Sequence, residues 1–184
     1  DLLLLFEEGI YLKKVPKDVN IKRVWRGNEN SLIKMYIRKI KRTIIRFSPK
    51  TIYKLFIKEK YDVEIAFVEG LSTMVLANST NNKSKKISWV HIDLKKHRTM
   101  SMKKERQCYK KIDNIVCVSN DSKRVFDELY NEHRNKSIVI YNMINKQEIE
   151  MLSNERVNYN FDTETVVAVG RLTDQKRFDI LIQA

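Results

Sequence analysis

Short apolar runs alternate with longer segments of helical periodicity along this chain, and that alternation constrains the fold more than any other feature. Most of the runs are continuously apolar, which is typical of strands covered on both faces. Strands joined in sequence by helices predict right-handed βαβ crossovers and a mainly parallel sheet. The runs span 2–6, 21–25, 63–68, 87–92, 115–118, 138–141 and 166–169, and the expected helices span 31–47, 51–60, 71–79, 101–111, 120–131 and 174–184. We therefore expect an α/β fold built on a Rossmann-like parallel sheet with flanking helices.

A polar and acidic segment near the end of the chain predicts a domain boundary. Residues 146–164 have no strong periodicity and lie between two predicted strands, as expected of a linker. The preceding residues 1–145 are numerous enough for one α/β domain. Residues 165–184 suffice only for the first strand and helix of a second one. Because the sequence opens on Asp1 rather than on a methionine, we interpret both ends as cuts.

Positive charge is concentrated in one part of the chain. Lys and Arg number 36 against 23 Asp and Glu, a formal charge of +13, which favours polyanionic partners without choosing among them. Segment 34–60 holds ten basic residues and one acid, Glu59. Within it, apolar residues recur at helical spacing: Ile33, Tyr36, Ile37, Ile40, Ile44 and Phe47.

Two interpretations of this basic segment remain open. A surface helix whose apolar stripe faces the core would have this pattern. So would a basic amphipathic element that docks on an anionic membrane. Specific nucleic-acid binding is disfavoured, because no groove-reading motif and no RNA-binding aromatic signature accompanies the charge.

Cysteine and histidine placement argues against disulfides and against a metal site. Cys108 and Cys117 lie on segments of different predicted type without paired spacing, so we expect two reduced, packed thiols. His91, His97 and His133 are not spaced like metal ligands. The apolar run at 2–6 is too short for a membrane span or a secretory signal.

Polar residues follow four of the predicted strands where each strand ends. Ligands of open α/β sheets bind beyond the carboxyl ends of the strands. A shared cleft at this edge is therefore favoured over a purely structural role for His91. The residues concerned are Glu69 and Gly70, His91 and Asp93, Ser119 with Asn120 and Asp121, and Asn142.

The segment VGRLTDQKRFDILIQA, residues 169–184, combines features suited to a diphosphate. Gly170 lets the backbone approach a ligand, Arg171 offers a planar fork to phosphate oxygens, and Lys176 adds a point charge. The start of the following helix contributes free N–H groups. The segment is neither a Walker loop nor a GxGxxG turn.

This segment resembles the opening of the C-terminal domain in the family-4 retaining glycosyltransferases (glycosyl transferases group 1). Upstream, YDVEIAFVEG, KISWVHIDL, IDNIVCVSNDSKRVF and SIVIYNMIN resemble, in order, strand segments of the N-terminal domain of that family. The ordered matches span residues 61–184, whereas residues 1–60 carry no motif. The resemblance implies a GT-B fold, in which two Rossmann-like domains face each other across a cleft.

The resemblance also implies roles for individual residues. Gly170, Arg171 and Lys176 would bind the donor diphosphate and stabilise the leaving group, and His91 would face the transferred sugar. A weaker assignment places a second set of residues toward the acceptor: Glu69, Asp93, Ser119 and Asn142. The implied reaction transfers a hexosyl unit from a nucleotide-diphosphate sugar with retention of configuration, and it needs no cofactor and no obligatory metal.

Departures from the family pattern qualify these implications. Arg177 follows the lysine where the family often has glycine. The first strand with its Gly-rich loop, and nearly all of the C-terminal domain, are missing, so we expect an incomplete, inactive fragment of an enzyme. The resemblance further implies a glycan or lipid-linked acceptor in surface polysaccharide assembly. The expected location is cytoplasmic, peripheral on the inner face of the membrane, with segment 34–60 against anionic lipid.

Two alternatives come from other classes of protein. The first is a non-catalytic basic α/β module that binds anionic membrane or nucleic acid. The second, a nucleotide-sugar epimerase or dehydrogenase, is disfavoured because the chain has no Gly-rich dinucleotide loop and no suitably placed Tyr-x-x-x-Lys pair.

Overall fold

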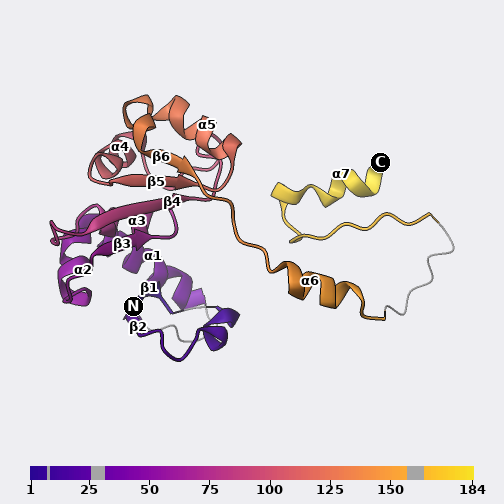
Figure 1. Ribbon diagram of the computed structural model, residues 1–184, viewed down its shortest axis with the longest axis horizontal. Helices are drawn as coiled ribbons and strands as arrows, with labels where there is room; N and C mark the ends of the chain where they lie inside the picture. Colours follow the sequence, from indigo (N-terminus) through magenta and orange to yellow (C-terminus); the bar gives the residue numbers. More distant parts are fainter. Residues whose placement is uncertain (8, 26–31, 157–163) are drawn as a thin grey trace. The chain divides into compact units, whose positions relative to one another are not determined.

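The computed structural model describes residues 1–7, 9–25, 32–156 and 164–184. The described chain divides into two compact units, Asp1–Asn142 and Met143–Ala184. Figure 1 shows the strands gathered in the first unit, and α6 (Lys146–Ser153) and α7 (Phe178–Gln183) in the second. The interpretation of 1–145, 146–164 and 165–184 as domain, linker and truncated second domain stays a prediction, and residues 157–163 of that linker lie outside the described ranges.

The first unit contains two parallel sheets. A two-stranded sheet pairs β1 with β2, and a four-stranded sheet has the order β3-β4-β5-β6, with every pairing parallel. The predicted parallel α/β architecture is therefore confirmed. The strands are β1 (Leu2–Phe6), β2 (Ile21–Trp25), β3 (Val63–Ala66), β4 (Lys85–Val90), β5 (Asn114–Cys117) and β6 (Ser137–Val139).

Helices fill the connections from β2 to β6, as the sequence predicts, whereas the short helical turn between β1 and β2 was not predicted. A 3-10 turn η1 joins β1 to β2, and η2 precedes β6. The helical elements of this unit are η1 (Ile10–Lys14), α1 (Leu32–Phe47), α2 (Pro49–Phe56), α3 (Leu71–Leu76), α4 (Met102–Lys110), α5 (Asn120–Leu129) and η2 (Asn131–Lys136).

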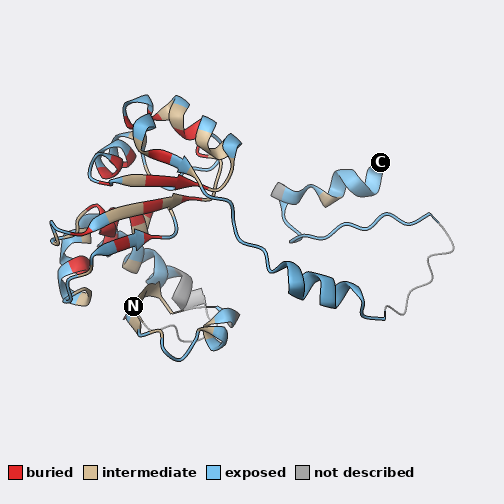
Figure 2. Cartoon of the chain, viewed as in Figure 1, coloured by how far each residue is buried: buried red, intermediate tan, exposed pale blue. Residues whose placement is uncertain are grey.

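The main core lies on one face of the four-stranded sheet. Ala66, Val90, Ile115 and Cys117 point to this face and pack with side chains of α3, α4 and α5. Figure 2 shows buried positions concentrated on these strands and helices. Three aromatic rings pack together in this core with centroids 5.1 Å apart: Tyr109 meets Phe126 and Tyr130 edge-on, and the latter two are tilted to each other.

The opposite face of this sheet is exposed along its edge strands β3 and β6, which differs from the expectation of strands covered on both sides, although Val116 on β5 is buried there. Ile65 is 53% exposed and Phe67 is 60% exposed, and Val63 and Ile138 are exposed as well. The helices after β3, β4 and β5 all contribute to the same core. The exposed apolar residues of the edge strands therefore lie outside this core.

A second core connects the two-stranded sheet with α1, α2 and α3. Its buried residues are Val24, Ile45, Ile52, Tyr53 and Val75, and Leu71 packs against both this core and the main one. The two sheets therefore share a continuous interior, although β1 and β3 do not pair with each other.

Helix α1 turns its apolar stripe away from this core, which corrects the interpretation of that stripe as core-facing. Ile45 is fully buried, whereas Phe47 is 80% exposed. The guanidinium of Arg38 lies over the ring of Phe6, and the ammonium of Lys41 lies over the ring of Trp25. The helix thus packs through Ile45 and basic side chains. The apolar residues exposed on it are Tyr36, Ile37, Ile40, Ile44 and Phe47.

The second unit departs most from the sequence predictions. Helix α6 (Lys146–Ser153) occupies part of the predicted linker. The Asn145 side chain caps it by accepting from the Glu148 N–H at 3.2 Å, and the Asn145 amide donates to the Glu148 carboxylate. This reciprocal arrangement resembles a capping box. The sequence signal was therefore Asn145 followed three residues later by Glu148.

The predicted strand at 166–169 is not assigned as a strand, whereas the interpretation of 165–184 as the start of a second Rossmann-like domain stays a prediction. Val169 is 94% exposed, and no strand is assigned over residues 164–170. A run of β-forming residues needs a neighbouring strand to complete its backbone hydrogen bonds. The expected helix at 174–184 is divided at Arg177 into η3 (Asp174–Lys176) and α7 (Phe178–Gln183).

Across the parts of the chain that the structure describes, no helix combines the length and apolarity that crossing a bilayer requires.

Candidate functional site

The four-stranded sheet places the predicted strand-end residues along one of its edges. Glu69 follows β3, His91 follows β4, Ser119 follows β5 and Asn142 lies just beyond β6. Because all four strands are parallel and adjacent in the order β3-β4-β5-β6, their carboxyl ends share that edge. The first unit thus presents polar groups where α/β sheets bind ligands.

Glu69 and His91 are in direct contact. The Glu69 carboxylate accepts a hydrogen bond from the backbone N–H of His91 at 3.2 Å, and its Oε2 lies 3.8 Å from His91 Nδ1. The Glu69 side chain is buried, whereas the imidazole is partly exposed. Glu69 therefore fixes the loop after β4 and leaves an edge of the imidazole available to a ligand.

Aromatic side chains flank this pair, and sequence reasoning missed them. The ring of Phe67 meets the imidazole of His91 edge-on at 5.0 Å between centroids, and it lies 5.5 Å from the ring of Trp89. The sequence signal was the i, i+2 spacing of Phe67 to Glu69 and of Trp89 to His91. Trp89 lies on β4, whereas Phe67 follows the last residue of β3.

A tight turn at Gly70 orients Glu69. Gly70 has φ 88 and precedes the first residue of α3. A Cβ at this position would lie 2.7 Å from Thr99 Oγ1. Both the left-handed backbone and the contact with Thr99 therefore require glycine.

Replacing Gly70 by alanine is expected to lower the free energy of unfolding by about 1–3 kcal/mol, because strain and a steric clash act together. Urea unfolding followed by circular dichroism measures this change. Gly9→Ala is the matched control, since Gly9 also has positive φ but a Cβ there meets nothing within 4 Å. Equal effects of the two substitutions would show that the Thr99 contact contributes nothing.

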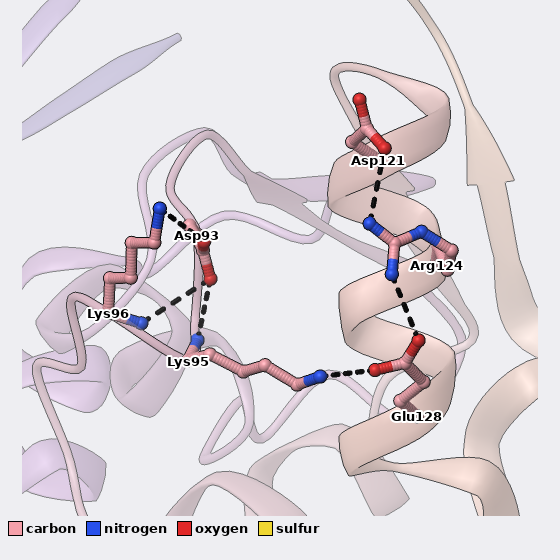
Figure 3. Close-up of polar contacts among 6 residues, drawn as sticks. All are labelled: Asp93, Lys95, Lys96, Asp121, Arg124 and Glu128. Carbon is pink, nitrogen blue, oxygen red and sulfur yellow. Dashed lines mark hydrogen bonds and ion pairs between the residues drawn. The ribbon is translucent and has the colours of Figure 1, made fainter.

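The Asp93 carboxylate is hydrogen-bonded within its own loop (Figure 3). Its Oδ1 accepts from the backbone N–H groups of Lys95 and Lys96 at 2.8 and 3.3 Å. The hydrogen bond from Lys95 is the main reason that the pKa of Asp93 is lowered. The Lys95 ammonium contacts Glu128 on α5, which also pairs with Arg124. Asp93 thus shapes the loop after β4, and its predicted contact with an acceptor stays a prediction.

Ser119 and Asn142 differ in how firmly they are held. The Ser119 hydroxyl caps α5 by accepting from the Ser122 N–H at 3.1 Å. Asn142 is exposed at the end of the first unit. Their neighbours in sequence, Asn120 and Tyr141, are hydrogen-bonded: the Asn120 side-chain amide donates to the Tyr141 hydroxyl at 3.1 Å. This hydrogen bond connects the segments that follow β5 and β6.

The predicted diphosphate residues lie together in the second unit. A Cβ on Gly170 would lie 3.6 Å from Lys176 Cγ and 3.2 Å from the ring of Phe178. The backbone N–H of Lys176 donates to the carbonyl of Thr173 at 2.9 Å, and the Arg171 side chain is exposed. The loop from Gly170 to Lys176 is therefore folded back on itself, with both basic side chains at its surface.

Arg177 occupies a backbone conformation that favours glycine. Its φ of 50 and ψ of 41 are left-handed, and within the described ranges it is the non-glycine residue with positive φ. Its guanidinium forms a bidentate pair with Asp179, with N···O distances of 3.1 Å. At this departure from the family pattern, the backbone is therefore strained and the guanidinium is paired with Asp179.

No group of three or more His, Cys, Asp and Glu residues in the described part of the chain is placed to hold a metal ion. Cys108 and Cys117 are free and buried, and burial is the main cause of the raised pKa of each thiol. The expectation that the reaction needs no metal stays a prediction.

Comparisons with known proteins give one informative similarity. No protein-family model matches the chain. Over 72 residues it is 44% identical to an uncharacterized glycosyltransferase of Methanocaldococcus jannaschii. The matched stretch covers 39% of this chain and 17% of the length of that relative.

Proposed function

We propose that the full-length polypeptide is a retaining glycosyltransferase of family 4 with a GT-B fold. In this proposal it transfers a hexosyl unit from a nucleotide-diphosphate sugar to a glycan or lipid-linked acceptor of surface polysaccharide assembly. The similarity to the archaeal glycosyltransferase supports transferase activity in general terms. The observation that carries the proposal is the line of polar groups at one edge of the parallel sheet, with Glu69 and His91 in contact.

Each unit supplies its own part of the proposed chemistry. In the second unit, Arg171 and Lys176 bind the donor diphosphate, and their positive charge stabilises the phosphate that leaves. In the first unit, His91 contacts the transferred sugar while Glu69 holds its loop in place. Asp93, Ser119 and Asn142 line the region of the acceptor. The chain's own cations perform the charge stabilisation, so no obligatory metal is part of the proposal.

Incubating the full-length polypeptide with a panel of nucleotide-diphosphate sugars tests the proposal. We expect release of nucleoside diphosphate with one or a few donors, and NMR of the product should show the anomeric configuration of the donor. Release with inversion would contradict the assignment to family 4. Failure of every donor, both with and without acceptor glycans, would contradict the transferase itself.

The exposed stripe of α1 supports a second part of the proposal, peripheral docking on anionic membrane. Ile37, Ile40 and Ile44 are exposed on α1 beside the basic residues Lys39 and Arg42. An amphipathic helix of this kind lies in the interface with its apolar side in the acyl region and its cations near the headgroups. Docking here would hold the enzyme on the inner face of the cytoplasmic membrane, where lipid-linked acceptors are found.

Replacing Lys39 and Arg42 together by alanine is expected to weaken binding to vesicles with 30% phosphatidylserine. Each basic residue near such a surface contributes about 1 kcal/mol, so the pair corresponds to roughly a 30-fold weaker association. Vesicle flotation at two salt concentrations measures it. Lys83→Ala with Lys85→Ala is the control, since both side chains are exposed, Lys83 just before β4 and Lys85 at its first residue. Binding to neutral vesicles as strong as to anionic ones, or salt-sensitive nucleic-acid binding in its place, would contradict membrane docking.

A further inference from the structure

A basic pocket lies between α1 and the start of α4 in the first unit. Its volume is 280 Å³, and three cationic side chains line it: Arg46 of α1, Arg98 of the loop after β4, and Lys104 of α4. Among the residues that the structure describes, no carboxylate lines this pocket. Three positive charges that converge on one cavity favour an anionic occupant.

The two arginines of the pocket are held in place by neighbouring groups. Arg46 Nη2 donates to the backbone carbonyl of Thr99 at 3.3 Å, and Arg98 Nε lies 3.2 Å from the carboxylate of the buried Glu105. Because Glu105 balances the charge of Arg98, the excess positive charge comes from Arg46 and Lys104. Neither of these two is paired with a carboxylate in the described part of the chain. Both cations are therefore available to an anion.

Polar groups at the start of α4 add hydrogen-bond donors to this basic pocket. The hydroxyl-bearing residues Thr99 and Ser101 line it. Ser101 precedes α4, which is nine residues long, and its side chain does not cap the helix. The first-turn N–H groups of α4 therefore lack that acceptor. A phosphate group, with several acceptor oxygens and a negative charge, matches the arginine, the lysine and these donors together.

The basic pocket adjoins the exposed apolar stripe of α1. The Lys104 ammonium lies 5.9 Å from the ring centroid of Phe47, which is 80% exposed. Ile44 and Ile40, about one and two turns earlier on the same helix, are exposed as well. An anion in the pocket can therefore carry an apolar chain that continues along α1.

The basic pocket also adjoins the candidate site at the strand ends. Thr99, which lines the pocket, is the residue that a Cβ on Gly70 would meet at 2.7 Å. Gly70 directly follows Glu69, whose carboxylate accepts from the His91 N–H. The apolar stripe, the basic pocket and the Glu69–His91 pair are therefore linked by residues in contact.

We propose that the basic pocket binds the phosphate group of a lipid-linked acceptor. The phosphate contacts Arg46 and Lys104, the lipid chain lies along the stripe of α1, and the sugar joined to the phosphate extends toward His91. This inference rests on the proposed function. It specifies the acceptor as a glycan joined to its lipid through a phosphate or diphosphate.

Titration with farnesyl diphosphate, a prenyl diphosphate without a sugar, tests the pocket directly. Calorimetry is performed on the full-length polypeptide carrying Arg171→Ala and Lys176→Ala, so that the ligand does not bind at the proposed donor loop. Replacing Arg46 and Lys104 together by alanine in this background should weaken binding about tenfold or more, because two charge-assisted contacts are lost. Arg98 is left in place, since its removal would leave the buried Glu105 without its cation.

Lys54→Ala with Lys103→Ala is the matched control for the pocket variant. It removes the same charge from exposed side chains on α2 and α4 that do not line the pocket. It should change the affinity for farnesyl diphosphate less than about twofold, since exposed charges outside the site are screened by salt. Equal losses in the two double variants would overturn the proposal, because binding would then follow net charge alone.

Two further ligands identify the source of the phosphate. Farnesyl diphosphate should bind at least about tenfold more tightly than inorganic diphosphate, a difference that burial of about two CH₂ groups provides. It should also bind more tightly than farnesol, which lacks the phosphates. Inorganic diphosphate or farnesol binding as tightly as farnesyl diphosphate would overturn the lipid-linked phosphate.

The titration is independent of the transferase assay because no nucleotide sugar takes part in it. Absence of farnesyl diphosphate binding would overturn the phosphate pocket, while release of nucleoside diphosphate from a donor would still support the glycosyltransferase. Failure of every donor in the transferase assay would contradict the proposed function instead. The two failures are therefore distinguishable.

Discussion

Replacing Arg171 by alanine in the full-length polypeptide is expected to lower turnover of the nucleotide-sugar donor by about 10²–10³-fold, the usual effect of removing one group that stabilises developing charge. The Arg171 side chain is exposed, and its carbonyl accepts from the Thr173 N–H at 2.9 Å. The backbone of the loop is thus held locally, so the substitution removes the guanidinium without removing a buried contact.

Arg177→Ala is the matched control for this prediction. Arg177 is a cation six residues away, but its guanidinium is bound to Asp179. Alanine also keeps a Cβ at the left-handed position, so the backbone strain is unchanged. Steady-state rates and calorimetric binding of the nucleoside diphosphate should separate the two variants. Equal losses of turnover in both variants would indicate a general effect of positive charge. Unaltered diphosphate binding by Arg171→Ala would show that Arg171 is not part of the donor site.

Replacing Glu105 by alanine is expected to lower the free energy of unfolding by about 3 kcal/mol, because it breaks a buried ionic network. Glu105 is 1% exposed on α4. Its Oε2 accepts from the hydroxyl of the buried Tyr130 and lies 3.2 Å from Arg98 Nε. Without the carboxylate, the buried Tyr130 hydroxyl loses its hydrogen-bond acceptor. Urea unfolding measures the change, and Glu128→Ala should cost less than about 1 kcal/mol because its ion pairs are exposed.

The same network makes the stability of the folded protein depend on pH. Burial raises the pKa of Glu105 above its ordinary value, while the Tyr130 hydrogen bond and Arg98 oppose that rise. The folded state therefore binds a proton more tightly at Glu105 than the unfolded chain does. The stability that this proton contributes is complete below the unfolded pKa and is lost as pH rises through the folded pKa.

Comparison of the wild-type chain with Glu105→Gln isolates this effect. Glutamine still offers an oxygen to Tyr130 but does not titrate. The stability advantage of the wild-type chain over the variant should shrink as pH rises from about 4, the unfolded pKa of a glutamate. Unfolding free energies measured at a series of pH values give the difference directly. A difference that stays constant with pH would show that Glu105 keeps the same pKa on folding.

The order and type of the elements in the first unit were predictable because their signals are local. The strands observed at β1 and β2 have the predicted bounds, and α1 ends at Phe47 as predicted. Continuous apolar runs and helical periodicity are properties of a few neighbouring residues. The same reasoning located Glu69 and His91 at strand ends, although it did not reveal Phe67 beside them.

Local signals were insufficient where the outcome depends on a distant partner. Val166–Val169 has the composition of a strand, but no other strand pairs with it in the described chain. Helix α6 was missed for the opposite reason, since its signal is a cap at Asn145 rather than an apolar stripe. At Arg177, the sequence indicated only a departure from a family pattern. The structure shows that this residue has a left-handed backbone conformation, which favours glycine.

The sequence by itself thus determined a parallel α/β chain with polar groups at the carboxyl ends of its strands, because side-chain periodicity is set along the backbone. Only the tertiary structure decided which surfaces are buried. It placed Ile45 rather than Phe47 against the core, paired the buried Glu105 with Tyr130, and left β1 and β3 unpaired with each other in the described part of the chain. Each of these outcomes depends on groups far apart in sequence, whose contacts no local pattern encodes.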